Sequence, residues 1–84
     1  MALIKPISPH KFALECLQKN DWENAHRIIQ TFSDPLSCRI HGLLHRIEGD
    51  LDNAAYWYSE ADLAVPGNSL EQEIASLWQL AEFH

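Results

Sequence analysis

Prolines, glycines and polar turn residues divide this chain into five short segments, and within each segment the apolar residues recur three and four positions apart. That spacing gathers apolar side chains on one face of an α-helix, whereas a half-buried β-strand requires alternation with a period of two. No segment alternates cleanly in this way. We therefore predict an all-α fold. The expected helices cover residues 9–19, 22–32, 35–48, 51–64 and 70–83.

The segment boundaries carry residues that begin and end helices. Side chains able to cap a helix N-terminus precede three of the segments, namely Ser8, Asp21 and Asp50. Gly49 can adopt the left-handed conformation that ends the third helix. A capping box for the fifth helix is formed by either Ser69 with Gln72 or Asn68 with Glu71. Local sequence and apolar periodicity thus agree on where the helices lie.

The second pair of helices repeats the first. Shifting the chain by 29 residues aligns similar positions, which are Leu14 with Leu43, Asp21 with Asp50, Asn24 with Asn53 and Ala25 with Ala54. We predict two antiparallel helical hairpins, 9–32 and 35–64, within a single domain 1–84. Stacked hairpins bury their apolar faces only against neighbours, so the segment 69–83 is expected to be a C-terminal capping helix.

Charge and hydropathy exclude several kinds of partner. Twelve acidic residues against six basic ones give a formal net charge of -6, which repels a phosphate backbone, so no nucleic acid is expected. No apolar stretch approaches the ~20 residues needed to cross a bilayer, and the N-terminal residues lack the pattern of a secretory signal. We expect a cytoplasmic protein that does not enter a membrane. In that reducing compartment Cys16 and Cys38 are expected to be buried thiols rather than a disulfide.

The stretch from Cys38 to Asn68 resembles a tetratricopeptide repeat. The small and aromatic positions of that family fall on Gly42, Gly49, Leu51, Ala54, Tyr58, Ala61 and Pro66. The resemblance implies a right-handed stack of hairpins in which Gly42 and Ala54 meet where two helices cross, because small side chains let the backbones approach. The first hairpin departs from the family, since Phe32 stands where a small residue is usual and the turn between the two hairpins is about five residues short. The string from His45 to Tyr58 is also similar to a segment of small uncharacterised bacterial proteins.

Tetratricopeptide repeats bind peptides or other proteins in a groove lined by the first helix of each hairpin, and the resemblance implies the same function here. The partner-binding residues expected on this analogy are Arg39, Leu43, Arg46, Trp57, Leu77 and Leu80. Such a groove is mostly apolar and suits an amphipathic helix, which could come from a second copy of the chain in a homodimer. The alternatives are that the apolar residues of the last helix only cap the core, and that Trp57 packs against that helix.

One constellation points to a different function. Cys38, His41 and His45 follow at intervals of three and four, so one stripe of a helix would present two imidazoles and a thiolate, which are ligands for zinc. Glu15 or Asp62 could supply a fourth ligand. However, any helical stripe gives this spacing, and Cys38 falls near a core position, so we predict no metal and no cofactor.

Glu48, Asp50 and Asp52 resemble the paired carboxylates of hydrolytic enzymes, but they surround a helix end and a helix start, where capping explains them. No phosphate-binding loop, serine elbow or zincin motif occurs in the sequence. We therefore expect no catalytic residues and no enzyme. The alternative function is a small metal-binding or enzymatic protein centred on His41, His45 and Glu48.

Overall fold

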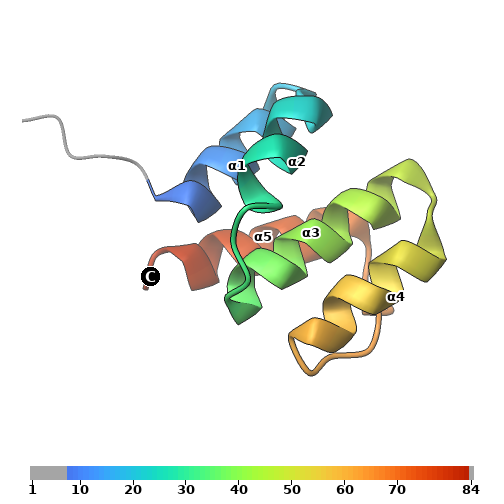
Figure 1. Cartoon of the computed structure of the whole chain (residues 1–84). Helices are drawn as coiled ribbons and strands as arrows, with labels where there is room; N and C mark the ends of the chain where they lie inside the picture. The colour runs from blue at the N-terminus through green and yellow to red at the C-terminus, as the bar shows by residue number, and fades with distance from the viewer. Residues whose placement is uncertain (1–7, 84) are drawn as a thin grey trace, which may run out of the picture.

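The structure, a computed structural model, describes residues 8–83, and this part of the chain consists of helices joined by turns and by one longer connection, 61–69, with no strand (Figure 1). The helices are α1 (Pro9–Gln18), α2 (Trp22–Ile29), α3 (Pro35–Glu48), α4 (Leu51–Glu60) and α5 (Leu70–Ala81). The predicted all-α class is confirmed. Residues 1–7 and 84, which the predicted domain includes, lie outside the described part.

Side-chain caps begin all five helices, and four of them are the caps that the sequence predicts, Asp34 being the exception. Ser8 accepts a hydrogen bond from the backbone N–H of Lys11 (3.2 Å), and Ser69 forms a complete capping box with Gln72. Aspartates cap the other three helices, namely Asp21 for α2, Asp34 for α3 and Asp50 for α4. Each of these contacts satisfies a backbone donor that the first helical turn leaves unpaired.

Residues in the left-handed conformation lie at or just after the ends of α1, α3 and α4. Gly49 ends α3 with a φ of 85°, as its sequence position predicts. Asn20 and Asp62 also have positive φ, 58° and 61°. Because the chain turns at Asp62, α4 ends at Glu60 and does not reach Ala64 as expected.

The helices form two packed pairs, α1 with α2 and α3 with α4, and α2 also packs on α3. α5 crosses behind α3 in Figure 1 and packs on both α3 and α1. The core draws fully buried apolar side chains from α1, α2, α3 and α5, and these are Ala13, Leu14, Ala25, Ile29, Ile40, Leu43, Leu44, Leu77 and Ala81. α5 is therefore part of the core. None of the helices described is long and apolar enough to cross a membrane.

Gly42 allows α3 and α4 to approach closely. A Cβ atom placed on Gly42 would lie 2.6 Å from Cδ2 and 2.8 Å from Cε2 of Tyr58, which is far inside van der Waals contact. The sequence predicts that Ala54 lies opposite this glycine, and the three nearest atoms belong to the Tyr58 ring, one helical turn after Ala54 on α4. Position 42 must be small because this aromatic ring packs against it.

Candidate functional site

The six residues expected to bind a partner differ widely in exposure. Leu43 and Leu77 are fully buried in the core, so they do not line an open groove. Arg39, Arg46 and Trp57 are partly buried, whereas Leu80 is 39% exposed. The side chains of α3 and α5 thus fill much of the space in which the sequence analysis placed a partner.

Arg39 makes a two-point ion pair with Glu73 of α5. Its Nε donates to Oε2 at 3.0 Å, and its Nη2 donates to Oε1 at 2.9 Å. The Glu73 side chain is completely buried and also accepts hydrogen bonds from the Tyr58 hydroxyl (3.1 Å) and the Asn68 amide (3.4 Å). Three side chains therefore donate four hydrogen bonds to one buried carboxylate, which joins α3, α4, α5 and the turn before α5.

Two opposing effects act on the pKa of Glu73. Burial raises it, because a charged carboxylate loses its hydration. The hydrogen bonds and positive charge of Arg39, followed by the hydrogen bonds of Asn68 and Tyr58, outweigh burial and leave the pKa below its usual value. Glu73 is consequently ionised at neutral pH, and the Arg39 charge is neutralised inside the domain.

Arg46, the second predicted cation, is also held by an internal contact. Its Nη2 donates to the backbone carbonyl of Asn68 at 2.7 Å, and its Nη1 donates to the Asn68 side-chain oxygen at 3.2 Å. Since both Arg39 and Arg46 are engaged within the domain, they do not form a ready clamp for the carboxylate of a partner.

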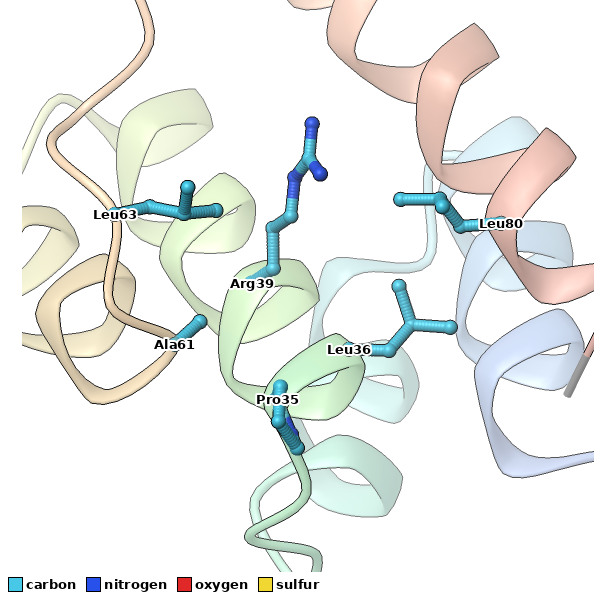
Figure 2. A pocket seen from close by; sticks show the side chains of 6 residues that line it. All are labelled: Pro35, Leu36, Arg39, Ala61, Leu63 and Leu80. Atoms are coloured by element: carbon cyan, nitrogen blue, oxygen red, sulfur yellow. The ribbon is translucent and has the colours of Figure 1, made fainter.

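A hollow of about 240 Å³ remains beside Arg39 (Figure 2). It is lined by Pro35, Leu36 and Arg39 of α3, by Ala61 and Leu63 of the segment after α4, and by Leu80 of α5. In Figure 2, Leu63 and Leu80 point from opposite sides toward the Arg39 side chain, and they are 41% and 39% exposed. The side chains around the hollow are apolar except for Arg39, whose charge is paired with Glu73. We call these six residues the α3–α5 groove.

The proposed metal ligands on α3 are only partly brought together. Cys38 is buried, and its Sγ lies 3.6 Å from the Ser33 carbonyl oxygen that accepts its hydrogen bond. His41 and His45 are buried beside a third histidine that the sequence analysis missed, His26 of α2. Nε2 of His41 lies 3.1 Å from Nε2 of His26. The α2–α3 contact that creates this cluster follows from hairpin stacking, but no local motif marks His26.

Tryptophan rings cover two of these histidines. Trp57 of α4 stacks on His41 with ring centroids 3.9 Å apart, and Trp22 stacks on His26 at 4.8 Å. Burial, and then repulsion from His26 and His45 in their protonated forms, lower the pKa of His41 to about 4, and burial lowers the pKa of His26. Both rings are thus neutral at pH 7. Trp57 packs on the histidine cluster, which neither sequence alternative anticipated.

The carboxylates around the α3–α4 turn have structural partners. Glu48 pairs with Nδ1 of His45 at 2.8 Å, and Asp50 accepts a hydrogen bond from the backbone N–H of Asn53 at 3.3 Å. Asp52 lies in the first turn of α4, where negative charge favours the helix dipole. The capping interpretation is confirmed for Asp50.

Comparison with protein-family models, with curated proteins and with solved structures finds no match for this chain.

Proposed function

We propose that this domain is a cytoplasmic protein-interaction module, without enzymatic activity, that holds a basic amphipathic helix of another protein in the α3–α5 groove. The observation that carries the proposal is the pair of half-exposed leucines, Leu63 and Leu80, which face each other across the hollow beside Arg39, whose charge is paired with Glu73 (Figure 2). An amphipathic helix places apolar anchors three and four positions apart, and such anchors suit a groove of this kind.

Charge favours a basic partner over a second copy of the chain. Arg39 contributes little positive potential to the groove, because its charge is paired with Glu73. Exposed Glu60 and Asp62 lie next to the groove residue Ala61, and the whole chain carries a formal net charge of -6. Two copies would repel each other, whereas a helix with Lys or Arg beside its apolar face would be attracted.

The proposal retains the relationship to tetratricopeptide repeats, including a right-handed stack of hairpins, but moves the place of docking. The pairs α1–α2 and α3–α4, with α2 on α3, support this arrangement. The contact between α5 and α1 departs from it, because hairpins in a repeat stack touch only their neighbours. With α5 closing the domain, the partner is expected to lie beside α5 and not in its place.

A synthetic peptide of about 14 residues, with Leu at i, i+3, i+4 and i+7 and Lys at the remaining positions, serves as the probe. Titrated into the labelled domain, it should shift the amide signals of the groove residues, and the same peptide with Glu in place of Lys should not. Leu63→Asp should weaken binding by about tenfold or more, as expected for loss of an anchor contact.

Leu51→Asp is the matched control, because Leu51 is 61% exposed and lies outside the groove. It adds the same negative charge without removing a groove leucine, so it should not weaken binding of the cationic peptide. If binding were only electrostatic, both substitutions would strengthen it, and the proposal would be wrong. Sedimentation that shows a dimer dissociated by Leu63→Asp would also overturn it, by making a second copy the occupant.

A further inference from the structure

A cluster of three histidines lies on the side of α3 that faces away from the α3–α5 groove. His41 and Arg39 are two positions apart on one helix, which separates their side chains by about 200° around the axis. His26 of α2 joins His41 and His45 of α3, and one ring nitrogen from each residue lies within 4.8 Å of the others. We propose that His26, His41 and His45 bind one Zn²⁺ ion through these nitrogens, with water as the fourth ligand. This inference does not depend on the proposed function.

The spacing of the ring nitrogens suits a single ion. Two imidazole nitrogens bound to a tetrahedral zinc ion, each at about 2.0–2.1 Å from the metal, lie about 3.3 Å apart. The Nε2 atoms of His26 and His41 lie 3.1 Å apart. His45 follows His41 by one helical turn, and histidines at i and i+4 on one helix are a recurrent pair of zinc ligands. Small side-chain movements would bring all three rings onto one metal.

The surrounding residues hold all three rings in place, and His45 also has the carboxylate partner that is typical of metal ligands. Glu48 pairs with Nδ1 of His45 at 2.8 Å, which leaves Nε2 of that ring available for the ion. A carboxylate on the outer nitrogen of a ligating histidine fixes its tautomer and raises its basicity. Trp22 and Trp57 hold the other two rings by stacking, and Trp22 is itself fixed by a hydrogen bond from Nε1 to the Leu44 carbonyl (2.9 Å).

The site leaves one position for an exchangeable ligand. Three neutral imidazoles do not reduce the charge of the ion. Among the described residues, the acidic side chains grouped with His45 are Glu48 and Asp50. His41 and His45 are buried, but His26 is partly exposed, which gives solvent access to the ion. Three histidines with an open fourth position form a coordination sphere that zinc commonly accepts.

The test is a zinc titration of the full chain after removal of metal by a chelator. We expect binding of about one ion per chain and a rise in Tm with zinc. When cobalt replaces zinc, we expect the visible absorption spectrum of a tetrahedral cobalt ion. Changes in the nitrogen chemical shifts of His26, His41 and His45 should accompany binding. Absence of stoichiometric binding would overturn the proposal.

Variants locate the site. His26→Gln should abolish stoichiometric binding while leaving the circular dichroism spectrum unchanged, since His26 is the most exposed of the three ligands. Glu48→Gln should weaken binding by about 10- to 100-fold, the usual effect of losing an outer-shell carboxylate. His10→Gln is the control, because His10 pairs with Asp34 outside the cluster. If the His26→Gln variant binds zinc with unchanged affinity, the ion is bound elsewhere and the inference is wrong.

Discussion

Replacing Arg39 with methionine should lower the free energy of unfolding by about 3–5 kcal/mol, the usual cost of removing one partner of a buried ion pair. The substitution keeps most of the side-chain volume but leaves the fully buried Glu73 carboxylate without its counter-charge. Tyr58 and Asn68 would still donate hydrogen bonds, but neither carries a positive charge. Urea denaturation followed by circular dichroism measures the change.

Two further variants isolate the role of the buried charge. Lys11→Met removes an ion pair with Glu82 that is 3.5 Å long and lies at the surface, so it should cost less than about 1 kcal/mol. Adding Glu73→Gln to Arg39→Met removes the buried charge and should recover part of the lost stability. Equal effects of Arg39→Met and Lys11→Met would show that the ion pair between α3 and α5 contributes no more than a surface pair.

Gly42→Ala should lower the free energy of unfolding by about 1–3 kcal/mol through overpacking. The added methyl group would stand 2.6 Å from the Tyr58 ring, which is fully buried and tethered to Glu73 through its hydroxyl. The ring therefore has little room to move. Alanine favours a helix over glycine by about 1 kcal/mol, so a loss of stability must come from the contact itself. Thermal and urea unfolding of the purified variant measure this loss.

Gly67→Ala provides the comparison for Gly42→Ala, because a Cβ atom at Gly67 meets nothing within 4 Å. It should change the stability by less than about 0.5 kcal/mol, as surface substitutions usually do. A variant at position 42 as stable as the wild type would mean that α3 and α4 do not approach each other as the structure shows.

The helices could be predicted because their signals are local. Caps such as Ser8 and Asp50, the left-handed Gly49 and the apolar spacing all act within a few residues. The early end of α4 could not be predicted, because it depends on Asp62 adopting a positive φ that aspartate only occasionally takes. Apolar periodicity alone continues to Ala64.

Contacts between distant segments were harder to predict. The sequence placed Leu43 and Leu77 in a groove, because it does not reveal that α5 crosses α3 and reaches α1, which buries both residues. One signal was present, since Glu73 lies four residues before Leu77 on the same helical face. An acidic residue among core positions indicates a buried partner, and Arg39 is that partner. His26 lies beside the histidines of α3 because α2 packs on α3, and no local pattern in the sequence specifies how these two helices align.

Our proposal requires that α5 stays packed in the core when a partner binds, so that the docking site is the α3–α5 groove and not the face of α3 that α5 covers. Native-state hydrogen exchange of the α5 amides is the sharpest check of this arrangement. We expect the amides near Leu77 to exchange only through global unfolding, with the same opening free energy as those of α3. Much faster exchange in α5, with α3 still protected, would show that α5 detaches as a lid, and the surface around Leu43 would then become the docking site.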